Sequence, residues 1–164
     1  MILPWSNRPI EVARLLNPAF CAIMIHESIS GYKQESDDGM PFALSFLVLP
    51  LVLHKPTREI LPRNIRTKLH NWIHQNQDML VGFDTRTQQL VPYTREAIYI
   101  GLQSKMLMIS ETGILDSSPC GYEQLSWIPT SEPAICKKKA NFVGRWFSRV
   151  GDTATIFAIL GVRP

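Results

Sequence analysis

The sequence predicts a mainly α-helical α+β fold with one β-hairpin. Hydrophobic residues recur at helical spacing along most of the 164-residue chain. Residues 106–116 differ, because two short apolar runs flank a turn that contains Gly113. A chain of this length can bury roughly two-thirds of its unfolded surface without metals or disulfides. We therefore expect residues 1–164 to form a compact single domain.

The first long helix has a clear start signal. Asn17 precedes Pro18, which gives an N-cap followed by a proline in the first helical turn. This pair predicts a helix that reaches about Tyr32. Residues 9–16 before it also have helical character, whereas residues 33–39 after it are polar and predict a flexible connection.

The apolar run 41–53 is compatible with a buried strand or a buried helix, because periodicity cannot separate the two in a continuous run. We favour a helix that is kinked or restarted at Pro50. With the preceding segments it completes a group of N-terminal helices over residues 9–53. The next segment, 54–62, is bracketed by prolines, which predict irregular structure.

Residues 64–117 predict a winged-helix-like unit. Asn64 can cap a first helix, Asp78 can begin a second, and Pro92 opens a third. The hairpin at 106–116 follows directly. The order of three short helices and a hairpin is that of a winged helix.

The last part of the chain is predicted to be helical after a loop. Residues 119–133 have a loop-like composition, and Trp127 is their only large anchor. Residues 134–164 form the C-terminal helices in this prediction. An amphipathic pattern reaches about Val150, and Asp152 can cap a last short helix.

Charge and composition bound the function. The chain has 17 Lys+Arg and 14 Asp+Glu, a net charge of +3, which does not indicate a protein built around phosphate neutralisation. Charged residues are only 19% of the chain, where ~25% is usual, so apolar surface is left that a partner subunit can cover. The longest apolar run is too short for the ~20 residues of a membrane span, and the start lacks the pattern of a secretory signal. We expect a cytoplasmic protein with no membrane partner.

No constellation of residues indicates catalysis, a cofactor or a metal. The three cysteines, Cys21, Cys120 and Cys136, are odd in number and widely spaced, so they form neither a disulfide framework nor a CxxC pair. His70 and His74 have the spacing of a two-histidine metal clip, but a third ligand is missing. A small thiol or metal hydrolase remains an alternative. It requires Cys136, or the two histidines, to converge in space with a base or a third ligand.

Two sets of residues are candidate contacts. Trp and Arg are enriched among interface anchors, and the predicted partner interface consists of Trp5, Arg145, Trp146, Phe147 and Arg163. A core role is the alternative for Trp146. Basic residues on and around the 64–117 unit can meet phosphates, and the predicted DNA contacts are Arg63, Arg66, Lys68 and Arg95.

Four phrases of the sequence together resemble a known family. They are NPAF at 17–20, LVLPLVLHK at 47–55 running on to Arg58 and the Leu-Pro pair at 61–62, GRWF at 144–147, and LGVRP at 160–164. In this order and spacing they resemble the middle component of bacterial three-component ABC systems, the small subunit of Lamassu-type defence against phages and plasmids. The likeness spans almost the whole chain.

The resemblance implies a non-enzymatic scaffold that binds an SMC-like ABC ATPase and an effector, often a nuclease, and helps to keep the effector inactive until invading DNA is sensed. Catalysis would reside in those partners, and DNA would be reached through the complex rather than directly. The alternative is a winged-helix DNA-binding regulator that acts alone. That alternative requires a basic recognition helix, yet residues 94–104 carry only Arg95, with Lys105 just beyond their end.

Overall fold

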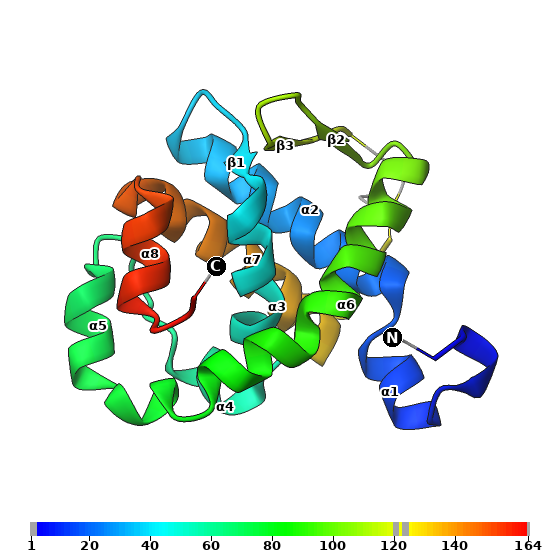
Figure 1. The fold of residues 1–164 in the computed structure, drawn as a ribbon, viewed down its shortest axis with the longest axis horizontal. Coiled ribbons are helices and arrows are strands. Elements are labelled where there is room, and N and C mark those ends of the chain that lie inside the picture. The colour runs from blue at the N-terminus through cyan, green and yellow to red at the C-terminus, as the bar shows by residue number, and fades with distance from the viewer. Residues whose placement is uncertain (1–2, 120–121, 123–124, 164) are drawn as a thin grey trace.

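The structure is a computed structural model that describes residues 3–119, 122 and 125–163. In chain order the elements are η1 (Trp5–Asn7), α1 (Ile10–Leu15), α2 (Pro18–Glu35), β1 (Met40–Pro41), η2 (Phe42–Leu44), α3 (Ser45–Val52), α4 (Lys55–Ile60), α5 (Leu69–Gln75), η3 (Gln77–Leu80), α6 (Phe83–Gln103), β2 (Leu107–Ile109), β3 (Ile114–Ser117), α7 (Glu132–Val150) and α8 (Thr153–Ile159). Helices α2, α3, α6 and α7 cross at the centre, with α5 and α8 to one side and the small sheet at the top (Figure 1). The predicted fold class, a mainly helical α+β single domain, is confirmed.

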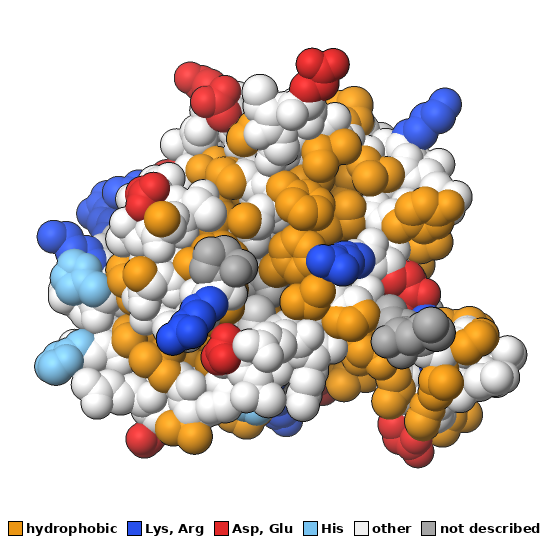
Figure 2. Space-filling model, in the orientation of Figure 1, with side chains coloured by type: hydrophobic (Ala, Val, Ile, Leu, Met, Phe, Trp, Pro, Cys, Tyr) orange, Lys and Arg blue, Asp and Glu red, His pale blue; other side chains and the backbone are white. Residues whose placement is uncertain are grey.

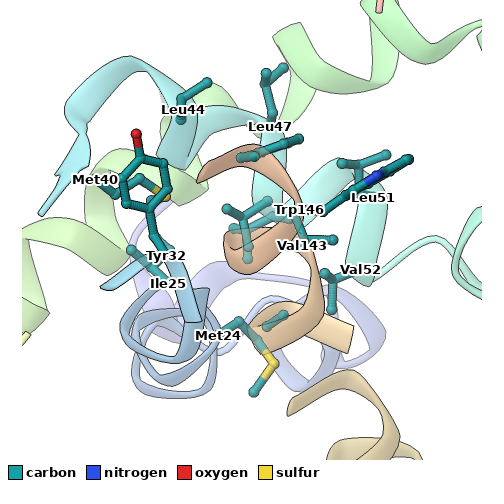
Figure 3. Packing of buried hydrophobic residues seen from close by; sticks show 14 of the residues in the cluster. Met24, Ile25, Tyr32, Met40, Leu44, Leu47, Leu51, Val52, Val143 and Trp146 are labelled. Atoms are coloured by element: carbon teal, nitrogen blue, oxygen red, sulfur yellow. The ribbon is translucent and has the colours of Figure 1, made fainter. Parts of the chain in front are cut away.

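The core forms where α2 lies along α7, with α3 and α6 packed against α2. Side chains from three of these helices meet there, as Figure 3 shows for Met24 and Ile25 of α2, Leu47 and Leu51 of α3, and Val143 and Trp146 of α7. Helix α2 is apolar around most of its circumference because it is covered on most sides. None of the described helices is both long enough and apolar enough to cross a lipid bilayer.

Helix α2 begins where the sequence predicts but ends three residues later than predicted. Its start is confirmed, because the Asn17 side chain accepts hydrogen bonds from the backbone N–H groups of Ala19 and Phe20 at 2.9 and 3.3 Å. Its end lies at Glu35 rather than near Tyr32. The flexible connection predicted for residues 33–39 is therefore wrong for its first three residues.

The extra turn of α2 is held by ion pairs with distant parts of the chain. Lys33 Nζ lies 2.5 Å from Asp116 of β3. The Glu35 carboxylate meets Arg145 at 2.8 Å and Arg149 at 3.1 Å, both on α7. Hydrogen bonds from these arginines, that of Arg145 above all, lower the pKa of Glu35.

The predicted hairpin is present as β2 and β3, and Gly113 supplies a turn residue with φ of +75°. A third strand was not predicted. The two-residue strand β1 pairs antiparallel with β3, with Met40 opposite Leu115, so the sheet order is β1-β3-β2. Such a short strand has no alternation to detect, and its pairing depends on a distant segment.

Two prolines that were expected to interrupt or distort helices, Pro50 and Pro56, lie inside helices. Residues 54–62 were predicted to be irregular, but they contain α4, in which Pro56 occupies the first turn. Proline is tolerated there because the first N–H groups of a helix have no intrahelical partner. In the run 41–53, the predicted helix is confirmed as α3, and it includes Pro50 without restarting.

The winged-helix-like unit at 64–117 is not confirmed. Its expected second and third helices are one 21-residue helix, α6, which runs through Pro92. The buried stripe of α6 continues on both sides of this proline, and its burial against α2 and α3 offsets the lost hydrogen bond. The first helix, α5, starts at Leu69, while Asn64 caps a turn by accepting from the Arg66 N–H at 2.9 Å.

The two predicted C-terminal helices are present, although α7 begins at Glu132, two residues before its predicted start. Of the loop predicted for residues 119–133, residues 120–121 and 123–124 lie outside the described part of the chain. Helix α7 reaches Val150, and the Asp152 side chain caps α8 by accepting from the Thr155 N–H at 2.8 Å. Before α7, Trp127 is half-buried and its ring centroid lies 6.2 Å from that of Phe20.

Candidate partner-binding surfaces

The N-terminal arm, residues 3–16, exposes several large apolar side chains. Leu3, Trp5, Ile10 and Leu15 are between 49% and 59% exposed, and α1 contains no buried residue. The arm projects from the body beside α6 (Figure 1). Single exposed apolar residues are normal, but four of them within one 14-residue arm, residues 3–16, indicate a candidate interaction surface.

A bidentate ion pair holds the arm to α6. Arg8 donates to both carboxylate oxygens of Glu96, at 2.9 and 2.7 Å, and its side chain is only 4% exposed. The guanidinium carbon lies 5.4 Å from the ring centroid of Trp5 and 5.8 Å from that of Tyr93. The hydrogen bond to Glu96 is the main reason that the pKa of Arg8 is raised. Trp5 is therefore positioned by a specific contact.

Hollows lie on two sides of the arm. One has a volume of about 370 Å³ and is lined by Leu15 on the arm and by Phe20, Arg58 and Cys136 on the body of the domain. Another, of about 500 Å³, also includes Leu15 and extends to Tyr93 on α6. The arm thus leaves room into which side chains of another protein can enter.

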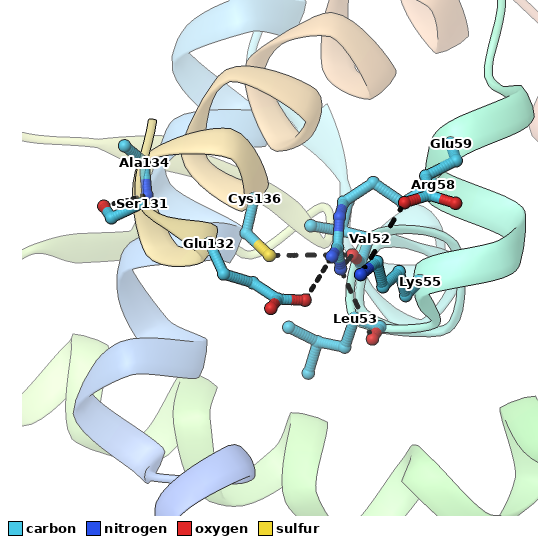
Figure 4. Close-up of polar contacts among 9 residues, drawn as sticks. All are labelled: Val52, Leu53, Lys55, Arg58, Glu59, Ser131, Glu132, Ala134 and Cys136. Carbon is cyan, nitrogen blue, oxygen red and sulfur yellow. Dashed lines mark hydrogen bonds and ion pairs between the residues drawn. The ribbon is translucent and has the colours of Figure 1, made fainter. Parts of the chain in front are cut away.

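Arg58 forms the floor of the smaller hollow and joins three helices (Figure 4). Its Nη1 donates to the Val52 carbonyl at 2.8 Å, and its Nη2 donates to the Glu132 carboxylate at the start of α7. The Cys136 thiol donates to the same Val52 carbonyl at 3.8 Å. Because Val52 ends α3, these contacts satisfy a carbonyl that has no partner within its own helix.

The alternative of a thiol or metal hydrolase finds no support among the described residues. Burial raises the pKa of Cys21 to about 12 and also raises the pKa of Cys136, although Arg58 opposes the second shift. Reactive thiols need the opposite change. His70 and His74 are exposed on α5. In residues 3–119, 122 and 125–163, no three His, Cys, Asp or Glu side chains are placed to hold a metal ion; Cys120 lies outside these residues.

The predicted DNA contacts divide into two places. Arg63, Arg66 and Lys68 are exposed on the loop before α5, and we call them the basic surface. Arg66 and Lys68 border a hollow of about 350 Å³ that also includes Arg149. Lys, Arg and His side chains gather on this side of the molecule, beside α5 and α8 (Figure 2). Arg95 is exposed elsewhere, on α6.

The predicted partner contacts also divide. Trp146 is 1% exposed and Phe147 is fully buried. The indole Nε1 of Trp146 donates to the Thr67 carbonyl at 2.6 Å. Arg145 is half-buried and paired with Glu35. Of the five predicted contacts, Trp5 and Arg163 are exposed. In the isolated chain Trp146 lies in the core, which was the alternative to a role in partner contact.

Ile10 and Leu15 were missed in the sequence. Both lie on α1, and a helix of six residues is too short to show a periodic pattern of apolar positions. The sequence therefore indicated only that two apolar residues were present.

These features define a small α+β domain whose most distinctive surfaces are suited to binding other macromolecules. Residues 5–164 match a family model described as ABC-three component (ABC-3C) system Middle Component 3. The chain belongs to this family. The likeness to middle components of ABC systems that the sequence indicated is thereby confirmed. No curated protein and no solved structure matches the chain.

Proposed function

We propose that this chain is a non-catalytic, cytoplasmic adaptor of a Lamassu-type defence system, which connects an SMC-like ABC ATPase to an effector such as a nuclease. The exposed apolar N-terminal arm is the observation that carries the proposal. An arm that is fixed by the pair between Arg8 and Glu96 and that exposes four large apolar side chains is suited to enter a partner subunit. Membership in a family of middle components supports the same proposal.

The first test is co-purification. We expect that the chain, tagged and co-expressed with its neighbouring genes, retains a large ATPase in a stable ratio. The double substitution of Ile10→Asp and Leu15→Asp should lower the retained ATPase at least tenfold, because it places charges where apolar contacts are needed. Val81→Asp is the matched control, since Val81 is 80% exposed and lies outside the arm. It should leave retention within twofold.

Several results oppose the proposal. If the arm substitutions lowered the retained ATPase no more than Val81→Asp does, the arm would not be the contact surface. A clean monomer with sequence-specific DNA affinity would instead favour the regulator that acts alone. Circular dichroism of each variant should be native-like, because all three positions are exposed.

In this proposal DNA is bound through the complex, and the basic surface is the part of this subunit that faces it. Of these residues, Arg63 lies close to further positive charge: burial lowers the pKa of Lys139, and Arg63 and Arg58 add to that effect. We expect charge reversal of the basic surface to weaken DNA binding by the purified complex. The logarithm of the DNA association constant should also fall less steeply with the logarithm of the salt concentration. Unchanged affinity and slope would assign DNA contact to the partners alone.

A further inference from the structure

A groove with an apolar floor lies between the start of α3, one face of α6 and the end of the chain. We call it the C-terminal groove, and the residues that define it are Phe42, Phe46, Val91, Arg95, Phe157 and Arg163. Its volume is about 280 Å³. Hydrophobic side chains gather over the centre of this face of the molecule, next to a basic side chain (Figure 2).

The floor is preformed by packing. Phe42 and Phe46 stand edge to face with ring centroids 5.3 Å apart, and both rings are half-buried. Phe157 of α8 is 6% exposed and is fixed in the core. Val91 lies opposite on α6. Three segments that are distant in the sequence therefore converge on one apolar hollow.

Two arginines flank this hollow. Arg95 and Arg163 are exposed and both line the groove. Within the described part of the chain, neither guanidinium forms an ion pair. An apolar floor between two arginines that form no ion pair with the described residues is complementary to a ligand that is apolar in the middle and anionic at its ends.

We propose that the C-terminal groove binds a short acidic segment of a partner protein. One apolar side chain of that segment enters between Phe46 and Phe157, and its flanking carboxylates face Arg95 and Arg163. A hollow of about 280 Å³ has room for one or two side chains of a peptide. Arginine and carboxylate can pair through two parallel hydrogen bonds, which gives such a contact direction as well as charge.

The inference rests on the proposed function, since an adaptor needs separate surfaces for two partners. Helix α6 supplies both. Tyr93 and Glu96 hold the N-terminal arm, whereas Val91 and Arg95, which are four residues apart, face the groove. A segment in the groove can therefore be bound while the arm is occupied.

The test is a photo-cross-link inside the purified complex. The cross-linker p-benzoylphenylalanine is placed at Gln88, which is exposed and lines the groove. After irradiation, mass spectrometry should identify one partner segment that contains an apolar residue between acidic residues. A cross-linked segment without acidic residues, or no cross-link in an intact complex, overturns the inference.

Charge reversal gives the matched comparison. The double variant of Arg95→Glu and Arg163→Glu should lower the cross-link yield at least tenfold. The double variant of Lys55→Glu and Lys138→Glu changes the net charge equally at exposed positions outside the groove and should keep the yield within twofold. Equal loss in both variants would show a general charge effect and would contradict the groove as the site.

Failure of the proposed function is recognised separately. If no neighbouring subunit co-purifies with the unaltered chain, the adaptor proposal fails, and the groove is tested on the isolated chain. The probe is then a fluorescein-labelled peptide with a Leu-Phe pair between pairs of aspartates. Anisotropy should show at least tenfold tighter binding to the unaltered chain than to the variant of Arg95→Glu and Arg163→Glu. Equal affinity for both proteins overturns the groove proposal.

Discussion

Replacing Gly144 by alanine is expected to lower the free energy of unfolding by ~3 kcal/mol or more. A Cβ atom at this position would lie 1.7 Å from the Ser28 carbonyl oxygen and 2.6 Å from its carbonyl carbon. These are backbone atoms of α2, so no side chain can rotate away. Helices α2 and α7 would have to separate along the contact that forms the centre of the core.

The same crossing depends on a second glycine. A Cβ atom at Gly31 would lie 2.1 Å from the Asn141 carbonyl oxygen, so Gly31→Ala should act in the same direction. Intrinsic helix propensity works the other way, since alanine is better than glycine by ~1 kcal/mol in a helix interior. Any loss of stability is therefore caused by the clash.

Urea unfolding followed by circular dichroism measures this effect. Lys138→Ala is the control on the same helix, because Lys138 is exposed, and its effect should stay within about 0.5 kcal/mol. Natural domains are stable by only ~5–15 kcal/mol in total, so the glycine variant should lose a large share. A Gly144→Ala protein with an unchanged midpoint would show that α2 and α7 are not in backbone contact.

Local signals explain which parts of the fold could be predicted. The caps at Asn17 and Asp152 act on N–H groups two or three residues away, so the sequence contains the whole interaction. The prolines at positions 56 and 92 could not be interpreted in this way. Whether a proline ends a helix depends on where the helix begins and on what its flanks bury, and both are tertiary facts.

The candidate surfaces were predicted to a smaller extent. Trp5 was identified because tryptophan is enriched among interface anchors. Arg95 and Arg163 were each identified, but with different roles, because nothing in the sequence indicates that α6 and the end of the chain line one groove. Arg8 was not identified at all, since its partner Glu96 is far away in the chain.

Trp146→Ala is expected to lower the free energy of unfolding by ~3–5 kcal/mol, as is usual when a buried aromatic side chain is removed. Its ring packs edge to face against Trp72 at 5.3 Å and also contacts Phe142 at 5.8 Å. The loss of the hydrogen bond to the Thr67 carbonyl adds to this cost, because that carbonyl is left without the donor. Trp146→Phe should lose less, since it retains most of the ring contact.

Trp5→Ala is the matched comparison and should show the opposite pattern. Trp5 is 49% exposed, and its contact with Arg8 is a cation–π interaction of ~0.5–1 kcal/mol at an exposed site. We expect its removal to leave the unfolding midpoint nearly unchanged and to reduce partner retention. Trp146→Ala, assayed at a temperature where it remains folded, should retain the partner. If Trp146→Ala instead left stability intact and abolished retention, the GRWF segment at 144–147 would be the interface after all.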